Sequence, residues 1–197
     1  MIVGAIIVLQ KFSYCELIGE MKLINRKFKQ YWRLILSQWA LATCLVLLVL
    51  FCLGRLLMTD ILSAIGVSSI AASAFIIFTL PDSPVAATRR VIGSYLFAMM
   101  IGVVINWVVR WIPQVYPGDS LLLLHQLGGA TAVALTMLAM IVFDYEHPPA
   151  AGFSLGLVLD QWNHWTLLVV FVAVIAFTTC SKLLHKRMVS VVGGDET

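Results

Sequence analysis

The residues best suited to chemistry stand at two breaks in an otherwise apolar chain. The second break reads Glu146-His147-Pro148-Pro149, which places a carboxylate, an imidazole and two prolines directly after an apolar run. Because proline suits the first position of a helix, we expect a short helix over residues 149–160 with Glu146 and His147 in front of it. The N-terminus of a helix attracts anions. This break therefore predicts a binding site for a small anion.

The first break offers a similar set of groups at Asp82, Ser83 and Pro84. Asp and Ser accept hydrogen bonds from free N–H groups, so we expect both to cap a helix that begins at Pro84. Arg89 and Arg90 would then lie in its first two turns, against the helix dipole, which is tolerable beside an anion or an acidic side chain. These arginines either supply a positive field for a bound anion or only set the orientation of the protein in the membrane, as positive charges on the cytoplasmic side.

Acidic and imidazole groups of the second break are the candidates to pair with these arginines. Asp144, Glu146 and His147 are available, and either a substrate role or a plain inter-helix salt bridge explains such pairs. His147 has the strongest functional case, because an ionisable group in or near the membrane is a functional hypothesis by default and histidine titrates near neutral pH. The alternative is a structural histidine that caps a helix or is hydrogen-bonded.

No metal, cofactor or catalytic residue is predicted. On the expected topology His125 and His164 lie near the opposite membrane face, too far from His147 to complete a metal site. The cysteines show no metal-ligand spacing, and within an apolar span cysteine acts as a small hydrophobe; they are Cys15, Cys44, Cys52 and Cys180.

Composition indicates a protein of the lipid bilayer. Of the 197 residues, 61% are hydrophobic and 12% are charged, and the mean hydropathy is +0.97. A soluble domain is about one quarter charged, and apolar stretches of about 20 residues indicate membrane helices. The sequence has no basic array that would suggest binding to nucleic acid.

The apolar stretches predict an all-α, polytopic membrane bundle of about six segments, one of which is the short helix after His147. The segments are expected near residues 34–53, 61–80, 86–109, 121–143, 149–160 and 165–181. Together they form one membrane domain over residues 34–185, between a basic cytoplasmic segment (1–33) and a short cytoplasmic tail (186–197). The first twenty residues are either a mis-assigned start or a segment on the membrane surface.

The positive-inside rule favours six crossings over five. With six, both termini face the cytoplasm across an inner (plasma) membrane, and eleven of the 13 Lys and Arg residues lie on that side. If residues 149–160 were re-entrant instead, eight would lie inside and five outside.

Small residues bear on how the helices pack. Residues 61–80 are rich in Ser, Ala and Gly, so this helix is expected to be central, since small residues let membrane helices approach closely. A stripe of small and polar side chains follows at a spacing of four, made of Ser94, Ala98, Gly102, Asn106 and Arg110. Helix packing explains the stripe, and the lining of a pathway is the alternative, with Asn106 as its main support.

A sequence similarity within the chain favours a parallel internal repeat. At an offset of 65 residues, residues 76–87 align without gaps on residues 141–152, so that Pro84 meets Pro149. Both breaks would face the cytoplasmic half with the same orientation, as in transporters built from parallel repeats. Chance similarity between apolar sequences is the alternative.

These motifs resemble the HPP family of integral membrane proteins, named for the triplet present here as His147-Pro148-Pro149. The run Pro81-Asp82-Ser83-Pro84-Val85-Ala86 is similar to the family's Pro-x-Ser-Pro-x-Ala, and the likeness covers roughly residues 35–185. Between the motifs, Ala87-Thr88-Arg89-Arg90 and Gly93-Ser94-Tyr95 replace the common Gln-Pro-Arg-Asn and Gly-Gly-His. The resemblance implies a helical membrane fold and, from plastid and cyanobacterial members, nitrite transport.

Three functions fit these residues. A permease or channel for a small inorganic anion, nitrite by resemblance, would use backbone N–H groups, Ser83 and His147 as donors and the paired arginines as a positive field. The alternatives are a membrane enzyme with Asp82, Glu146 and His147 as acid–base groups, and a scaffold or sensor. We favour transport without enzyme activity. We also expect a homo-oligomer, because a protein of this size often needs a second copy to enclose a pathway.

Overall fold

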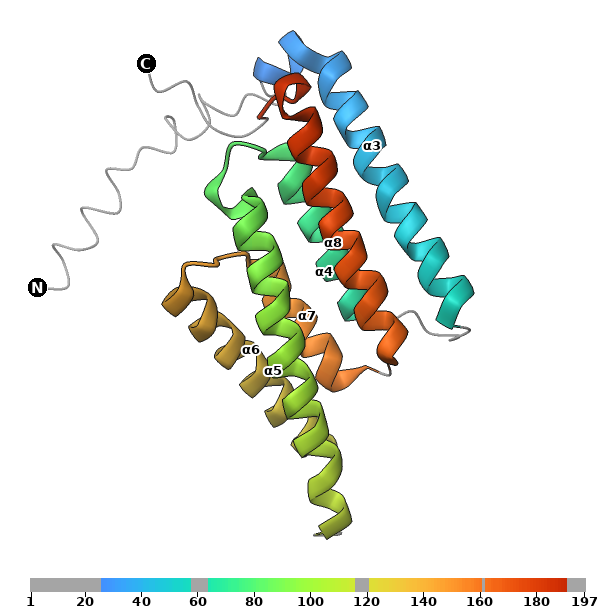
Figure 1. Ribbon diagram of the computed structural model, residues 1–197, viewed down its shortest axis with the longest axis vertical. Helices are drawn as coiled ribbons and strands as arrows, with labels where there is room; N and C mark the ends of the chain where they lie inside the picture. The colour runs from blue at the N-terminus through green and yellow to red at the C-terminus, as the bar shows by residue number, and fades with distance from the viewer. Residues whose placement is uncertain (1–25, 58–63, 116–120, 161, 191–197) are drawn as a thin grey trace, which may run out of the picture.

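The computed structural model describes residues 26–57, 64–115, 121–160 and 162–190. Within these residues the chain forms six α-helices and two 3-10 turns and contains no β-strand (Figure 1). The elements are α3 (Arg26–Leu57), α4 (Ala64–Thr79), η1 (Pro84–Ala86), α5 (Thr88–Val115), α6 (Leu121–Phe143), α7 (Pro148–Leu159), α8 (His164–Leu184) and η2 (His185–Arg187).

The predicted all-α membrane fold is confirmed, and one helix stands at each predicted segment. Four helices, α3, α5, α6 and α8, are long and apolar enough to cross a membrane. That the shorter α4 and α7 also contribute crossings stays a prediction. The predicted surface segment at residues 1–20 lies outside the described residues.

The short helix α7 lies at the centre of the bundle. It packs against α4, α5 and α6, and in Figure 1 its ribbon lies between α5 and α8. Its 12 residues extend over about 18 Å, well short of the roughly 30 Å hydrocarbon core of a bilayer. It is therefore too short to cross the bilayer alone, and most of its residues are buried: Ala150, Ala151, Phe153, Ser154, Gly156, Leu157 and Val158.

Small residues bring α4 and α7 close together, as the composition of residues 61–80 predicts. A Cβ placed on Gly156 would lie 3.1 Å from the backbone nitrogen of Gly66, and one on Gly152 would lie 2.9 Å from Ser69 Oγ. Helix α4 also packs against α3 and α8. Its predicted central position is thus confirmed.

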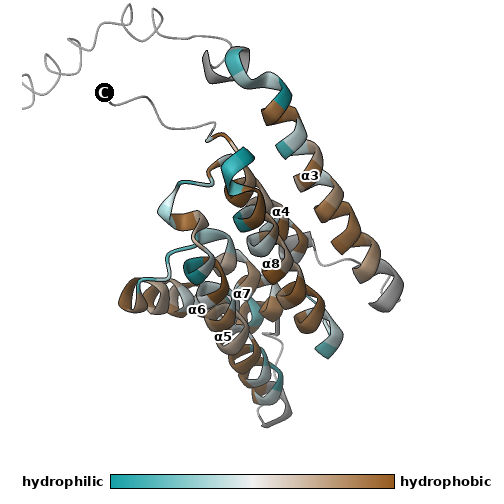
Figure 2. Cartoon of the chain, turned by 45° about the horizontal axis from the view of Figure 1, so that its top comes forward, coloured by the Kyte–Doolittle hydropathy of each residue, from teal (hydrophilic) through white to brown (hydrophobic). Residues whose placement is uncertain are grey.

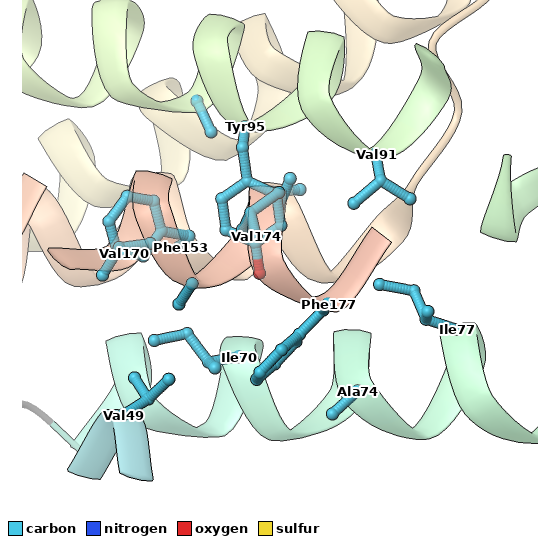
Figure 3. Close-up of a cluster of buried hydrophobic side chains, with 14 of the residues drawn as sticks. Val49, Ile70, Ala74, Ile77, Val91, Tyr95, Phe153, Val170, Val174 and Phe177 are labelled. Atoms are coloured by element: carbon cyan, nitrogen blue, oxygen red, sulfur yellow. The ribbon is translucent and has the colours of Figure 1, made fainter. Parts of the chain in front are cut away.

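Large side chains from several helices fill the core (Figure 3). The ring centroids of Tyr95 on α5 and Phe153 on α7 are 5.6 Å apart, and those of Phe78 on α4 and Phe177 on α8 are 6.2 Å apart in edge-to-face geometry. Each such pair stabilises by about 0.5–1.5 kcal/mol beyond its burial. In Figure 3 the Tyr95 hydroxyl points away from α5 into the interior.

The outside of the bundle is apolar as well. Figure 2 shows hydrophobic ribbon along most of the helices and hydrophilic segments near one end of α3 and of α8. Trp107, Leu122 and Val142 are 65%, 73% and 67% exposed. A soluble protein rarely exposes large contiguous apolar patches, so this surface contacts the lipid bilayer.

Two helix starts differ from the prediction. Helix α3 already begins at Arg26, but the backbone of Tyr31 is non-helical (φ −120°, ψ 23°), so a short basic helical segment precedes the main helix across a kink. The first break holds only the three-residue turn η1, and α5 begins at Thr88, because Ala87 is extended (φ −60°, ψ 129°).

The prediction of a helix that begins at Pro84 and is capped by Asp82 and Ser83 is therefore wrong. Ser83 occupies the N-cap position of η1, but its side chain makes no capping hydrogen bond within the described part of the chain. One 3-10 turn is also too short to develop the dipole of a helix.

Candidate functional site

The two breaks meet at one end of the bundle, where the start of α5 contacts the α6–α7 connection. Arg90 Nη2 donates to Asp144 Oδ1 at 2.6 Å, and Arg90 Nη1 lies 3.9 Å from Glu146 Oε2. The predicted pairing of the arginines with the second break is thus observed for Arg90. The Asp144 and Glu146 side chains are 65% and 55% exposed, so solvent screening limits each pair to about 0–1 kcal/mol.

Arg89 contacts an aromatic ring instead of a carboxylate. Its guanidinium carbon lies 5.1 Å from the centroid of the Tyr145 ring, in a cation–π contact. The same ring lies against Gly93, where an added Cβ would be 2.7 Å from a ring carbon. Asp144 precedes Tyr145 and has a left-handed φ of 56°, which Asp tolerates better than most residues. The turn at Asp144 thus lays Tyr145 across the start of α5.

His147 is fully buried, and both of its ring nitrogens are hydrogen-bonded. Nδ1 lies 2.8 Å from the carbonyl oxygen of Val85 in the first break, and Nε2 lies 2.8 Å from Ser73 Oγ on α4. Because a carbonyl oxygen only accepts, Nδ1 carries a hydrogen and donates to Val85. His147 therefore joins both breaks to α4.

The hydrogen bonds continue beyond Ser73. Ser73 Oγ lies 2.8 Å from the Tyr95 hydroxyl oxygen, and that oxygen also lies 3.2 Å from the Ser69 carbonyl oxygen, so the hydroxyl can donate to either of them. Both side chains are buried, so each polar atom needs such a partner. The side chains of His147, Ser73 and Tyr95 are named the His147 network below.

The N-terminus of α7 offers a dipole but few hydrogen-bond donors. Pro148 and Pro149 have no N–H, and the Ala150 N–H donates to the His147 carbonyl at 3.0 Å. The predicted coordination of an anion by backbone N–H groups is therefore wrong for the first three residues of α7. The partial positive charge of the helix end remains.

A cavity of about 240 Å³ lies beside this end of α7. Since one water molecule occupies about 30 Å³ of liquid, the cavity has room for a small ion with several waters. Its walls are mostly apolar, with one carboxylate and one imidazole: Val85, Met137, Met140, Ile141, Glu146, His147, Pro148 and Ala151.

Asn106 lies at the opposite end of α7 from His147. Its Nδ2 donates to the Leu157 carbonyl at 2.8 Å and reaches the Val158 carbonyl at 3.4 Å. The last carbonyls of a helix lack partners within the helix, and Asn106 supplies one. The contact favours the packing interpretation of the stripe on α5 over the lining of a pathway.

The remaining predicted residues of the first break also lie apart from the cavity. Asp82 Oδ1 is 3.5 Å from His185 Nε2 of η2, and among the described residues neither Asp82, Ser83 nor Pro84 lines the cavity. Within the same described residues, no three His, Cys, Asp or Glu side chains gather as metal ligands.

Comparison with known proteins identifies the family. Residues 28–190 match the family described as HPP, transmembrane region. The chain belongs to the HPP family. A transmembrane protein of Dictyostelium discoideum is 30% identical to it over 99 residues, which are 50% of this chain and 32% of the relative, so the chain spans about a third of that protein's length. No solved structure matches.

The HPP triplet points to His147, but no local pattern in the sequence indicates its partners Ser73 and Val85, or Tyr95 beyond Ser73. Ser73 is one of many small residues in 61–80, where its type indicates only close helix packing. Tyr95 belongs to the Gly93-Ser94-Tyr95 step that departs from the common Gly-Gly-His of the family, which was the available signal. Val85 takes part through its backbone carbonyl oxygen. Every residue has this group, so the identity of Val85 does not predict the contact.

Proposed function

We propose that this HPP protein is a permease or channel for a small inorganic anion, with nitrite as the candidate implied by the family resemblance. The observation that carries the proposal is the cavity beside His147, at the positive end of a helix too short to cross the bilayer. Transporters and channels use helices that end within the membrane domain to direct dipoles at ions.

Electrostatics supply the attraction in this mechanism. The helix end contributes roughly half a positive charge, and Arg90 stands next to it. The 3.9 Å separation of Arg90 Nη1 from Glu146 Oε2 is long for an ion pair, so an entering anion can replace Glu146 at that nitrogen. The mostly apolar walls favour a weakly hydrated anion such as nitrite, because less hydration free energy is lost on entry.

We place six crossings in the inner membrane, with both termini in the cytoplasm. In Figure 1 the starts of α3 and α5 and the end of α8 lie toward the same end of the bundle. The positive-inside rule makes that end cytoplasmic, because these segments carry Arg33, Arg89, Arg90, Lys182, Lys186 and Arg187. On this topology the cavity communicates with the cytoplasmic side.

We further propose a homo-oligomer and a parallel internal repeat. A short break joins α4 to α5, and another joins α6 to α7, with prolines within the first and directly after the second, which supports the repeat. The aligned prolines differ in setting, since Pro84 begins a 3-10 turn and Pro149 is the second residue of α7.

Anion flux into proteoliposomes of the purified protein tests the transport proposal, with nitrite, nitrate, formate and chloride compared. His147→Ala is expected to lower nitrite flux about tenfold or more, because it removes two hydrogen bonds of about 1 kcal/mol each that fix the cavity wall. His164→Ala, at the start of α8, is the matched control and should transport normally. Glu146→Gln should lower the nitrite concentration at half-maximal flux, because a competing charge is lost.

Unchanged flux in the His147→Ala protein would remove this residue from the mechanism. No flux above that of empty liposomes, from protein shown to be folded and inserted, would overturn transport. A membrane scaffold, a sensor or a membrane enzyme would then remain.

A further inference from the structure

The His147 network can take up one more proton without losing a hydrogen bond. With His147 neutral, Nδ1–H donates to Val85 and the bare Nε2 accepts from the Ser73 hydroxyl. The Tyr95 hydroxyl then donates to Ser73 Oγ at 2.8 Å. All the hydroxyl hydrogens point toward His147 in this state.

With His147 doubly protonated, the direction of the hydrogen bonds reverses. Nε2–H donates to Ser73 Oγ, and the Ser73 hydroxyl turns to donate to the Tyr95 oxygen. The Tyr95 hydroxyl donates in turn to the Ser69 carbonyl at 3.2 Å. The same heavy-atom positions serve both states, and only two hydroxyl hydrogens rotate.

We propose that His147, Ser73 and Tyr95 form a proton-binding site in the membrane domain, with a single H⁺ held on His147 Nε2. The three side chains are 0%, 1% and 0% exposed, so bulk water does not reach the site directly. His147 lines the cavity, which gives the proton its route to and from the site. A buried histidine with a structural role needs partners for one protonation state, whereas this network supplies them for two.

The charges around His147 are few and largely paired. Residues 64–79 of α4 contain no charged or titratable side chain. Glu146 lines the same cavity and lies 3.9 Å from Arg90, and Arg90 is offset by its two acidic partners. The other titratable or charged groups on the elements packed around the site are Asp82, Arg89, Tyr95, Asp144 and Tyr145 at this end, with Arg110, His125 and Asp160 at the far ends of α5, α6 and α7.

The proton site rests on hydrogen-bond geometry alone, but its use in transport rests on the proposed function. An H⁺ on His147 would offset the charge of an anion in the adjoining cavity. Anion and H⁺ would then cross the membrane together.

Nitrogen-15 NMR of the full chain in lipid nanodiscs, labelled at histidine, reads the ring protonation between about pH 4 and about pH 9. The His147 signal is assigned by its loss in the His147→Gln protein. In Tyr95→Phe the neutral state keeps the bond from Ser73 to Nε2, whereas the charged state loses the Tyr95 oxygen and leaves the Ser73 hydroxyl only a carbonyl of its own helix as an acceptor. We therefore expect the midpoint of the His147 titration to move to lower pH by about one unit or more.

Tyr145→Phe is the matched control, since Tyr145 lies outside the His147 network against Gly93 and Arg89. A shift in Tyr95→Phe with none in Tyr145→Phe supports the proton site. Equal midpoints in all three proteins, or a His147 ring that keeps one protonation state throughout, overturn it. Phenylalanine keeps the ring that packs on Phe153, and thermal unfolding checks that both variants are folded.

Nitrite uptake with and without an inward H⁺ gradient separates this inference from the proposed function. A titration shift without flux under any condition supports the proton site and refutes transport. Flux without any titration of His147 refutes the proton site and leaves transport standing. Flux that does not depend on the H⁺ gradient, in a protein whose His147 titrates, refutes the coupling of anion transport to H⁺.

Discussion

Replacing Gly93 with alanine tests whether the two breaks hold each other in place. A Cβ at this position would lie 2.7 and 2.8 Å from two carbons of the Tyr145 ring, well inside van der Waals contact. The ring is also held by Arg89 at 5.1 Å. Either Tyr145 or the start of α5 must therefore move, and Tyr145 is two residues from His147.

The expected magnitude combines two opposing contributions. Overpacking in a well-packed site costs about 1–3 kcal/mol, whereas alanine in a helix is favoured over glycine by about 0.5–1 kcal/mol. Gly93→Ala should therefore lower the free energy of unfolding by roughly 1–2 kcal/mol. In a Tyr145→Ala background the ring is absent, so the same substitution should stabilise by about 0.5–1 kcal/mol.

Equilibrium unfolding in mixed micelles with increasing dodecyl sulfate measures all four proteins of this double-mutant cycle. The structure predicts a coupling of about 1–3 kcal/mol and a change of sign between the two backgrounds. An equal effect of Gly93→Ala in both backgrounds would refute the contact between Tyr145 and α5.

Three other substitutions, at two positions, are predicted to change the free energy of unfolding in the same assay. Asn106→Leu should lower the free energy of unfolding by about 1–3 kcal/mol, because it leaves the Val158 carbonyl at the end of α7 without its donor. An unchanged free energy of unfolding would show that lipid or water satisfies that carbonyl. Asp144→Gly should be no less stable than the native protein, because relief of the left-handed backbone offsets an exposed ion pair. Asp144→Val should lose about 1–2 kcal/mol or more, and equal stabilities of the two Asp144 variants would contradict the strain argument.

Apolar runs and prolines were enough to predict most of the helix boundaries. The predicted segment at residues 121–143 matches α6, and the predicted 149–160 matches α7 to within one residue. Polar groups and proline stop these helices, so the sequence marks their ends. The start of α3 differs from the prediction because a short basic helical segment precedes the kink at Tyr31, and hydropathy does not indicate that segment. The helix predicted from Pro84 failed because the extended backbone of Ala87 separates η1 from α5.

Only some residues of the candidate site could be predicted from the sequence, for a different reason. Ionisable side chains are rare in an apolar chain, so His147 and the charged residues around it are predictable candidates for a functional site. Ser73 and Tyr95 are 74 and 52 residues from His147 along the chain, and each is of a residue type that also suits ordinary helix packing. Their contacts arise when α4 and α5 pack around α7, and no local pattern encodes that arrangement.

Three other buried hydroxyls bond differently from Ser73, and the difference supports a functional explanation of the His147 network. Ser94, Ser154 and Thr178 donate to carbonyls of their own helices, which satisfies a hydroxyl in an apolar interior at little cost. Ser73 instead reaches two side chains on other elements. The Ser69 carbonyl, inside α4, already has the helical N–H four residues on as its partner. The bond from Tyr95 is therefore not needed to complete the helix, but it is needed when His147 holds a second ring proton.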